Sequence, residues 1–315
     1  MLNAILVSSA SGKIPLLKSL RESKICSELG FEVYAGDSDP SSLSFQFCES
    51  NWVMPKTDDK YLTEIIEGCK ERHIKIVIPT RDGELRFYSR NKQVFMDQGI
   101  QILVADEGAV ELCLDKKLFS DSLQSLGIAA IPSYLSLDSR IGDSVVVKER
   151  FGAGSQNMAL DLTRAEAEIY AASLENPVYQ PMVSGREFSV DVWVSQDRNV
   201  AIASPRMRDL VIDGEAKVTT TFLNKEIEDL AINLTRAIGV TGISVVQGFI
   251  LPNDEILVIE CNARFGGATT ASINSGIPMF DLALFNLIGK STDFLLSCVN
   301  RKNIRQVRAS FDYCF

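Results

Sequence analysis

Short apolar runs alternate with longer segments of helical spacing over the first third of the chain. The apolar runs predict β-strands at Ala4–Ser8, 30–35, Ile74–Pro79 and 100–105. Between them, the spacing of apolar residues predicts helices at 13–29, 61–72 and 83–98. Strands that alternate with helices indicate a parallel sheet covered by helices on both faces. We therefore expect an α/β domain over residues 1–110.

The pattern changes after Asp106. It predicts a helix at 111–126, a valine-rich strand at 144–148, a helix at 164–173 and, from about Glu187, an alternating strand. Further on, two β-like runs at 243–251 and 256–261 flank four residues that include Pro252, Asn253 and Asp254. Turn-forming residues between two such runs are typical of a β-hairpin. The tail at 303–315 is rich in β-forming residues, and we expect it to close a sheet and pack on the preceding lobe.

The predicted hairpin brings three oxygen-bearing side chains together. We place Leu251 opposite Ile256 at the turn. Counting back along both strands then puts Gln247 opposite Glu260, and Asn262 projects to the same face of the sheet. Oxygen ligands with few charges suit Mg²⁺ that is shared with nucleotide phosphates. The alternative is a solvated strand end that binds nothing.

The overall composition excludes several classes of function. Of the 315 residues, 46% are hydrophobic and 23% are charged, as in ordinary globular proteins. The net charge of −9 argues against a nucleic-acid partner, which requires a basic surface. No apolar run reaches the roughly 18 residues of a membrane helix, and the start lacks the basic region of a signal peptide. We therefore expect no membrane partner.

Cysteine and histidine usage points to a reduced, cytoplasmic protein without histidine chemistry. The seven cysteines are irregularly spaced and form no CxxC pair, which is typical of reduced thiols in the cytoplasm. His73 is the single histidine of the chain. With one histidine, the chain offers almost no basis for a Ser-His-Asp triad or a multi-histidine metal site. We therefore expect His73 to be structural.

A lysine and a loop of small residues follow the strand at 144–148. Lys148 ends the strand, and the loop contains Gly152, Gly154, Ser155 and Gln156. Backbone N–H groups of such a loop can bind phosphates, and the lysine supplies a mobile point charge. A solvated hairpin tip with a surface lysine is the alternative.

The segment 178–194 runs from an apolar stretch through Gly185 into an alternating strand. It has the form that a hinge between two lobes would need in order to hold adenine. The backbones of Pro181 and Val183 would bind the adenine edge, and Glu187 would accept from ribose hydroxyls. An ordinary strand–turn–strand with a surface glutamate is the alternative.

The N-terminal domain offers a weaker candidate site. Its first turn contains Gly12 and Lys13, but it lacks the GxGxxG fingerprint and the Ser/Thr that follows the lysine of a P-loop, so we assign no nucleotide there. Ligands of open α/β sheets bind at the carboxyl ends of the strands. Four residues at such ends are candidates for part of the acceptor substrate site: Asp37, Asp39, Thr80 and Asp82.

The order of these segments resembles the ATP-grasp superfamily, with the closest likeness to the carbamoyl-phosphate-synthetase large-subunit type and its small single-unit relatives. The run from Glu260 to Arg264, Glu-Cys-Asn-Ala-Arg, is similar to the family's Glu-x-Asn-Pro-Arg. The stretch 205–217, with Pro-Arg-Met-Arg and Gly-Glu-Ala-Lys, looks like a segment that borders the substrate in related ligases. The resemblance implies a Rossmann-like parallel-sheet domain at 1–110 and a two-lobed ATP-grasp domain at 111–315. Its lobes would cover about 111–185 and 186–315.

The resemblance also implies a role for each matching residue. It implies that ATP is bound by Lys116, Lys148, Gly152, Gly154, Ser155, Gln156, Gln180, Pro181, Met182, Val183 and Glu187. It implies Mg²⁺, with Mn²⁺ as a substitute, on Gln247, Glu260 and Asn262. Lys148 and Arg264 would act on the transferred phosphoryl group, and Arg206 is our candidate for steadying it.

Three departures from the family pattern affect this expectation. Ala263 replaces the usual proline, and Pro181 stands where many relatives have an acidic residue. Gln247 is neutral, which leaves Glu260 as the single formal charge of the metal set. The phosphates must then supply much of the affinity for the metal.

The implied activity is that of an ATP-dependent carboxylate–amine, or peptide-like, ligase. It would form an acyl phosphate on a small carboxylate, pass the acyl group to an amine, and release ADP and phosphate. One alternative is a bicarbonate- or carbamate-phosphorylating unit of the carbamoyl-phosphate-synthetase type. Another is an ATP-binding regulatory protein without turnover. A homodimer through the N-terminal domain is one option for its assembly.

Overall fold

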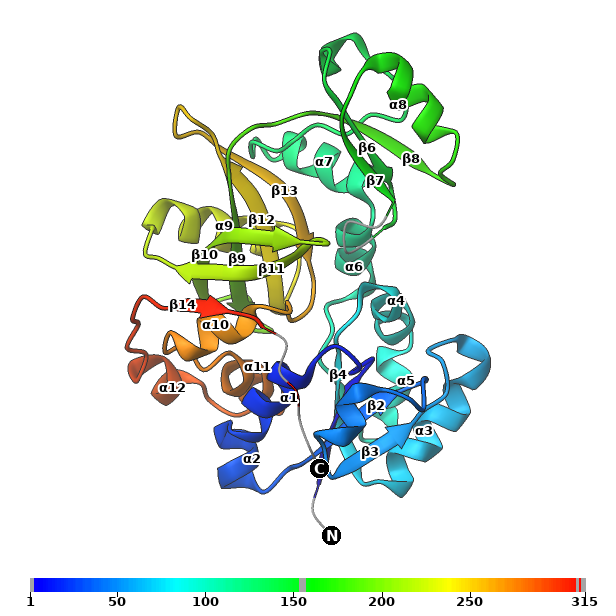
Figure 1. Ribbon diagram of the computed structural model, residues 1–315. Helices are drawn as coiled ribbons and strands as arrows, with labels where there is room; N and C mark the ends of the chain where they lie inside the picture. The colour runs from blue at the N-terminus through cyan, green and yellow to red at the C-terminus, as the bar shows by residue number, and fades with distance from the viewer. Residues whose placement is uncertain (1–2, 153–156, 310–311, 313–315) are drawn as a thin grey trace.

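A five-stranded parallel sheet forms the N-terminal part of the chain (Figure 1). The computed structural model describes residues 3–152, 157–309 and 312. The sheet has the order β3-β2-β1-β4-β5, and its strands are β1 (Ala4–Ser8), β2 (Glu32–Asp37), β3 (Ser50–Val53), β4 (Ile74–Pro79) and β5 (Gln101–Ile102). The α/β architecture predicted from the alternating pattern is confirmed. The short edge strand β3 was not predicted.

Three helices that the spacing predicts as continuous are each divided in two. The N-terminal helices are α1 (Ile14–Arg21), α2 (Lys24–Leu29), α3 (Leu62–Glu71), α4 (Asp82–Arg90), α5 (Lys92–Asp97), α6 (Glu107–Leu114) and α7 (Lys116–Ser125). Short 3₁₀ helices are η1 (Leu43–Gln46), η2 (Asp59–Tyr61) and η3 (Ser139–Ile141). The predicted helix 13–29 breaks at Ser23, whose backbone is extended. The predicted helix 111–126 breaks at Asp115, which caps α7 by accepting from the N–H groups of Lys117 and Leu118. The predicted helix 83–98 is interrupted at Asn91.

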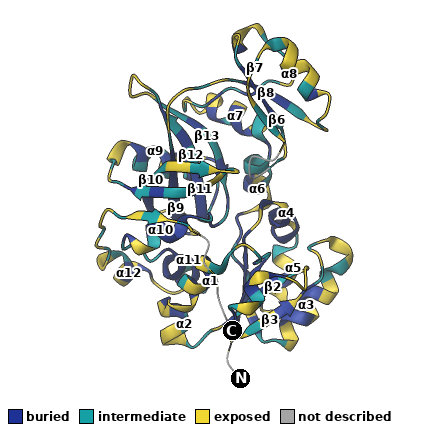
Figure 2. Cartoon of the chain, viewed as in Figure 1, coloured by how far each residue is buried: buried dark blue, intermediate teal, exposed yellow. Residues whose placement is uncertain are grey.

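A small antiparallel lobe follows and stands apart at the top of Figure 1. Its strands β6 (Val145–Glu149), β7 (Met158–Leu162) and β8 (Pro177–Pro181) lie in the order β7-β6-β8, and α8 (Arg164–Ala171) packs on them. Val145, Val147, Ala167 and Tyr179 belong to a hydrophobic core of its own. Half of the residues of α8 are exposed, whereas β9 and β12 of the larger sheet are largely buried (Figure 2). The lobe therefore depends little on the core of the rest of the molecule.

A six-stranded antiparallel sheet forms the largest part of the molecule. Its order is β13-β12-β9-β10-β11-β14, with strands β9 (Arg186–Val194), β10 (Ala201–Ile212), β11 (Glu215–Thr221), β12 (Gly242–Ile250), β13 (Ile256–Asn262) and β14 (Arg305–Val307). One face of β9 is apolar, with Phe188, Val190 and Val192 buried in the core that includes α9 (Lys225–Ala237). The other face carries polar residues at alternate positions, among them Glu187 and Asp191. This polar face is available for chemistry.

The end of the chain packs back on its beginning. Helices α10 (Thr269–Asn274), α11 (Met279–Leu287) and α12 (Asp293–Ser297) share a core with α1 and α2, to which Leu17, Leu20 and Leu284 belong (Figure 1). The backbone N–H of Ile25 donates to the Asp281 carboxylate over 2.9 Å. β14 pairs with β11, which confirms for the described part of the tail that it closes a sheet. None of the helices in the described residues has the length and apolar character needed to span a membrane.

The hairpin formed by β12 and β13 has the predicted pairing at its functional end and a different pairing at its turn. Ile250, rather than Leu251, pairs with Ile256, so the predicted register at the turn is wrong by one residue. The turn is instead closed by the Leu251 N–H, which donates to the carbonyl of Glu255 over 2.8 Å. A β-bulge next to Gln247 then absorbs one extra residue of β13. Gln247 therefore does lie opposite Glu260, as predicted.

Candidate functional site

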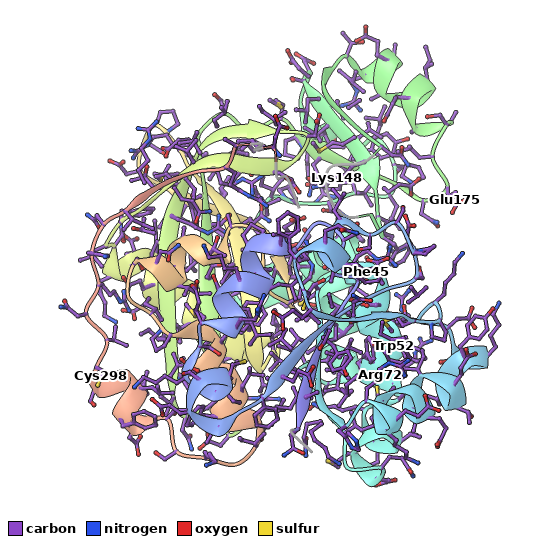
Figure 3. All side chains as sticks on the ribbon, turned by 60° about the horizontal axis from the view of Figure 1, so that its bottom comes forward. Phe45, Trp52, Arg72, Lys148, Glu175 and Cys298 are labelled. Carbon is purple, nitrogen blue, oxygen red and sulfur yellow. The ribbon has the colours of Figure 1, made fainter. Side chains whose placement is uncertain are left out.

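A cleft of about 620 Å³ opens onto the polar face of the large sheet and is also lined by the small lobe and the N-terminal domain. It collects every described residue that was predicted to bind ATP or a metal or to act in catalysis: Lys116, Lys148, Gly152, Gln180, Pro181, Met182, Val183, Glu187, Arg206, Gln247, Glu260, Asn262 and Arg264. The predicted phosphate-loop residues Gly154, Ser155 and Gln156 lie outside the described residues. Figure 3 shows Lys148 where the small lobe meets the body of the molecule.

The hairpin strands place Gln247, Glu260 and Asn262 on the cleft face. Asn262 Nδ2 donates to Glu260 Oε1 over 3.0 Å. Burial alone would raise the pKa of Glu260, but the charges of Lys148 and Lys116 outweigh it and hold that pKa below its usual value. Glu260 is therefore ionised at neutral pH.

These three residues fit Mg²⁺ that is shared with a substrate. They offer oxygen donors, which hard divalent cations prefer, but only one formal charge. Among the described residues there is no cluster of three or more His, Cys, Asp or Glu that could hold a metal by itself. Because Mg²⁺ is commonly bound by one or two protein carboxylates together with phosphates, a lone Glu260 suits this mode of binding.

Lys148 and Lys116 lie within electrostatic reach of Glu260. Val145 and Val147 point into the core of the small lobe, so the alternation of β6 directs Lys148 to the cleft. Among the described residues, the Lys148 ammonium has no hydrogen-bond partner. Burial lowers its pKa to about 8, although the charge of Glu260 opposes that change. The Lys116 ammonium instead donates to the carbonyl of Gly152, at the start of the predicted phosphate loop.

The predicted adenine segment follows β8 directly. The Gln180 side chain is buried and donates to Ser133 Oγ over 2.8 Å, so its amide is already held by the protein. The Met182 N–H donates to the carbonyl of Ser144 over 3.0 Å. In the described part of the chain, the backbone N–H of Val183 makes no hydrogen bond, which leaves it available to a ligand.

Glu187, the predicted ribose acceptor, has an internal partner that the sequence did not reveal. Its Oε1 lies 2.9 Å from Arg208 Nε, and Arg208 Nη2 also donates to the carbonyl of Gly214 over 2.9 Å. Burial nevertheless raises the pKa of Glu187, and the charge of Arg208 only partly opposes this change. A ribose hydroxyl would therefore share Glu187 with this arginine.

Arg264 joins the two domains across the cleft. Its guanidinium forms a two-pronged ion pair with Asp82, the first residue of α4, and Nη1 donates to the carbonyl of Phe265 over 3.1 Å. Nη2 also lies 3.4 Å from Asn262 Oδ1. Of the four polar residues predicted at strand ends of the N-terminal sheet, only Asp82 contacts a predicted catalytic residue.

The other three residues of that group serve the N-terminal domain itself. Asp37 accepts from the Ser11 N–H over 3.0 Å. Asp39 accepts from the backbone and hydroxyl of Ser41. Thr80 is buried and its hydroxyl donates to the carbonyl of Ser8 over 2.7 Å. None of the three lines the cleft.

Arg206 lies under the cleft in a buried network. Its Nε donates to Asp191 Oδ2 over 2.8 Å, and Asp191 also accepts from the hydroxyls of Thr269 and Ser272 over 2.5 and 2.6 Å. The Nη1 atom of Arg206 is buried without a hydrogen-bond partner among the described residues. The contact with Asp191 thus holds the Arg206 guanidinium in place, and its Nη1 atom remains without a hydrogen-bond partner among the described residues.

Six further charged residues line the cleft without an individual role assigned from the sequence: Lys13, Glu149, Arg208, Asp213, Glu215 and Arg308. Three of them, Arg208, Asp213 and Glu215, belong to the stretch 205–217 that was expected to border the substrate. Lys13 belongs to the Gly-Lys pair that we set aside because it matches no nucleotide motif, and Arg308 follows β14 in the tail. No local signal in the sequence marks Arg308, because only the pairing of β14 with β11 brings it to the cleft.

A second hollow, of about 770 Å³, lies beside β3 and α3 and contains none of the predicted site residues. There the Arg72 guanidinium lies 4.7 Å from the centre of a Trp52 ring, and Figure 3 shows the two side chains together. Because Gly68 on α3 lacks a side chain, Trp52 can pack against the helix.

Comparison with known proteins gives two family matches. Residues 113–268 match the family model described as the ATP-grasp domain. Residues 5–103 match the model described as the PylC-like, N-terminal domain. The two matches lie side by side and together span most of the chain.

Curated relatives of this chain include large chains of carbamoyl phosphate synthase. The arginine-specific chloroplastic large chain of Arabidopsis thaliana is 24% identical, over 92% of this chain and 27% of the relative. The N-terminal section of the large chain of Aquifex aeolicus is also 24% identical, over 92% of this chain and 57% of the relative. The chain thus spans about a quarter of the first relative and just over half of the second.

Solved structures share the fold at low sequence identity. Biotin carboxylase of Campylobacter jejuni, in a complex with β-γ-ATP, aligns with a TM-score of 0.78 at 16% identity, over 98% of this chain and 76% of that one. The L-amino acid ligase of Bacillus licheniformis aligns with a TM-score of 0.73 at 15% identity, over 97% and 79% of the two chains.

Proposed function

Because the chain belongs to the ATP-grasp superfamily, we propose that it is an ATP-dependent carboxylate–amine ligase that works through an acyl phosphate. One observation carries this proposal: all thirteen described residues with an expected nucleotide, metal or catalytic role line one cleft between the two lobes. Among the described residues that line the cleft there is no histidine, cysteine or serine that could act as an activated nucleophile. Phosphoryl transfer needs positioning and charge neutralisation rather than such a group.

The proposed reaction has two steps. A carboxylate oxygen of the first substrate attacks the γ-phosphorus of ATP, which forms an acyl phosphate and releases ADP. The amine of the second substrate then attacks the acyl carbon, the C–O bond to phosphate breaks, and the amine loses a proton. The products are an amide, ADP and inorganic phosphate.

The residues of the cleft would divide this work. The Val183 N–H would bind adenine and Glu187 would accept from the ribose. Lys148 and Lys116 would neutralise the phosphates, and Arg264 would hold the transferred phosphoryl group, with its orientation fixed by Asp82. Gln247, Glu260 and Asn262 would hold Mg²⁺, which supplies charge neutralisation at the phosphate oxygens when it is bound.

Arg206 would contribute from below the cleft. Its Nε is committed to Asp191, so only its remaining nitrogens could face the transferred group.

We also propose the domain division expected from the sequence, with a boundary near residue 110 and lobes that meet near residue 185.

A bicarbonate- or carbamate-phosphorylating unit is the second candidate. The observation that favours it is the 24% identity to carbamoyl phosphate synthase large chains over 92% of this chain. The two candidates differ in the substrates that trigger ADP release. A ligase needs both a carboxylate and an amine, whereas the second candidate responds to bicarbonate or carbamate.

Calorimetry and an ADP-release assay test the proposal together. We expect the purified protein to bind ATP with Mg²⁺, and to release ADP only when a panel member from each of two sets, small carboxylates and amino acids, is present. Lys148→Met should weaken ATP binding by about tenfold or more, because a charge-assisted hydrogen bond contributes roughly 1.5–3 kcal/mol. Lys225→Met is the matched control, because the Lys225 side chain is 80% exposed on α9.

Two results would contradict the ligase. ADP release with bicarbonate alone would favour the second candidate. ATP binding without ADP release over the whole panel would favour a regulatory nucleotide-binding protein.

A further inference from the structure

The cleft has an excess of positive charge in a chain whose net charge is −9. Among its described lining residues, seven are cationic and five are acidic. Three of the arginines have close carboxylate partners: Arg206 with Asp191, Arg208 with Glu187, and Arg264 with Asp82. The nucleotide and its metal account for the lysines near Glu260. Two cations remain without an assigned role, Lys13 and Arg308.

Lys13 and Lys148 belong to different electrostatic groups within the cleft. The charges that influence Lys148 are those of Glu260 and Lys116. The charges that influence Lys13 are those of Arg264, Glu215, Arg308 and Asp82. The charge of Arg264 also lowers the pKa of Glu260, so Arg264 belongs to both electrostatic groups. A substrate held at Arg264 would therefore have the nucleotide on one side and the Lys13 group within reach.

The Lys13 ammonium has no partner of its own. Among the described residues, it makes no hydrogen bond and no ion pair. Burial lowers the pKa of Lys13, and the nearby positive charges of Arg264 and Arg308 act in the same direction. A bound anion would offset both effects.

The loop that carries Lys13 is held in place by buried carboxylate contacts. Glu84, which is completely buried, accepts from the Ser9 hydroxyl over 2.9 Å and from the Thr80 N–H over 2.7 Å. Asp37 accepts from the Ser11 N–H over 3.0 Å. The Lys13 N–H itself donates to the carbonyl of Ala10 over 2.8 Å. The backbone below Lys13 is thus preorganised, which lowers the cost of binding a ligand.

Arg308 reaches the cleft from the segment that follows β14. Its N–H donates to the carbonyl of Lys217 over 2.8 Å, which extends the pairing of β14 with β11 by one residue. The guanidinium lies over Gly267, where a Cβ atom would stand 3.1 Å from Nη1. Among the described residues, its nearest carboxylate is that of Glu215, which lies 3.7 Å away and also accepts from Lys217 over 2.8 Å. Arg308 therefore retains most of its hydrogen-bonding capacity.

We propose that Lys13 and Arg308 form an anion subsite for a second acidic group of the substrate. The substrate class is then a carboxylic acid that carries another carboxylate or a phosphate, with its reacting carboxylate at Arg264. This inference rests on the proposed ligase function for the identity of the reacting group. The subsite itself rests on two cations of the cleft: Lys13, which has no hydrogen bond or ion pair among the described residues, and Arg308, which has only the long ion pair with Glu215. A monocarboxylate would leave Lys13 unpaired in the cleft.

Binding measurements test the subsite without relying on turnover. The protein is first saturated with ADP and Mg²⁺, and calorimetry then measures the affinity for succinate and glutarate, for butyrate as a monocarboxylate, and for a phosphorylated carboxylic acid. We expect at least one dianionic acid to bind about tenfold or more tightly than butyrate, because a second charge-assisted contact contributes roughly 1.5–3 kcal/mol. The comparison of the dicarboxylates with the phosphorylated acid identifies the second acidic group.

Two neutral variants and two matched controls locate the effect. Lys13→Met and Arg308→Met should each weaken binding of the preferred dianion by about tenfold, and leave binding of butyrate and of ADP unchanged. Lys13→Arg, which keeps the charge, should restore most of the affinity. Lys18→Met on the exposed side of α1 and Arg305→Met on the exposed side of β14 should have no effect. Unchanged ADP affinity also shows that each variant is folded.

The outcomes separate the subsite from the ligase function. Equal affinity for butyrate and for every dianion, or an equal effect of Lys18→Met, would overturn the subsite. If dianions bind through Lys13 and Arg308 but no acid of the panel supports ADP release, the subsite stands and the ligase function fails. If butyrate supports full ADP release and Lys13→Met changes nothing, the ligase function stands and the subsite fails.

Discussion

Two carboxylates, Asp191 and Glu260, project from the same face of the large sheet and have opposite surroundings. Asp191 on β9 is fully buried, and three side chains donate to it, including the guanidinium of Arg206. Within the part of the chain that the structure describes, Glu260 on β13 accepts a hydrogen bond only from Asn262, and the charge of the Lys148 ammonium lowers the pKa of Glu260 without a direct contact. The described residues thus supply Asp191 with a counterion and three donors, whereas they supply Glu260 with one hydrogen bond.

This difference in hydrogen-bond partners indicates which of the two carboxylates is available to bind a ligand. A buried ion pair costs desolvation energy, and the hydrogen bonds around Asp191 offset that cost inside the folded chain. Glu260 and Lys148 have opposite charges in one cleft, but no hydrogen bond or ion pair joins them. Groups held in this way keep their capacity for metal and phosphate, which is a common property of sites that bind charged ligands. Stability and function should therefore respond differently to mutation of the two residues.

Neutralising Asp191 should give the largest loss of stability. Asp191→Asn leaves Arg206 buried without its counterion, and we expect the free energy of unfolding to fall by about 3–5 kcal/mol. Urea denaturation followed by circular dichroism measures this change. The double variant Asp191→Asn/Arg206→Met removes both charges and should recover part of the loss. A decrease below about 1 kcal/mol in the single variant would mean that the network is not what holds this part of the sheet.

Neutralising Glu260 should affect turnover instead. Glu260→Gln removes the single formal charge of the proposed metal set, and we expect ADP release to fall by about 100- to 1000-fold, in the range typical of losing one preorganised electrostatic contact. The free energy of unfolding should change by less than about 1 kcal/mol, because Glu260 forms no ion pair within bonding distance. Glu255→Gln, at the exposed turn of the same hairpin, is the control. Full turnover in Glu260→Gln would remove Glu260 from the metal set.

Strand pairing shows how much of this site the sequence could predict. Counting back from the predicted turn placed Gln247 opposite Glu260, and the structure has this pair, but only because a bulge offsets a turn register that was wrong by one residue. The bulge that compensates for this error has only an indirect signal, Gly248. A side chain there would collide with the carbonyl of Leu257 and with the ring of Phe188. Periodicity in one strand cannot reveal such a contact with its neighbours.

Helix boundaries and distant partners were the least predictable features. The predicted helix 111–126 breaks because Asp115 accepts from two N–H groups of α7 and forms an ion pair with Arg150, which is remote in sequence. The cations of the proposed anion subsite have the same character. Lys13 and Arg308 come from opposite ends of the chain and meet only through the packing of complete domains. Local patterns contain no information on such partners, whereas the motifs did select described residues that line one cleft.

The smallest expected effect is on the pH dependence of the unfolding free energy. It tests whether Glu260 and Asp191 have different electrostatic surroundings. The pKa of Lys148 is lowered to about 8 from an ordinary value of 10.5, with burial as the main cause. Between these two values the unfolded chain binds more protons than the folded chain, so this residue makes stability rise as pH increases from about 8 to 10.5. The difference in unfolding free energy between the wild type and Lys148→Met, measured by urea denaturation at several pH values, isolates this contribution. It should increase in favour of the wild type over that interval and be flat below it.

Glu260→Gln should extend this interval to lower pH, because the carboxylate of Glu260 opposes the decrease in the pKa of Lys148 in the folded chain. Asp191→Asn should leave the interval where it is, since Asp191 is not among the charges that influence Lys148. If both variants shifted the interval equally, the two carboxylates would share one electrostatic environment, and the distinction between a structural and a ligand-binding carboxylate would be lost. If only Glu260→Gln changes the pH interval, the charges of Glu260 and Lys148 are coupled to each other and are independent of the buried network around Asp191.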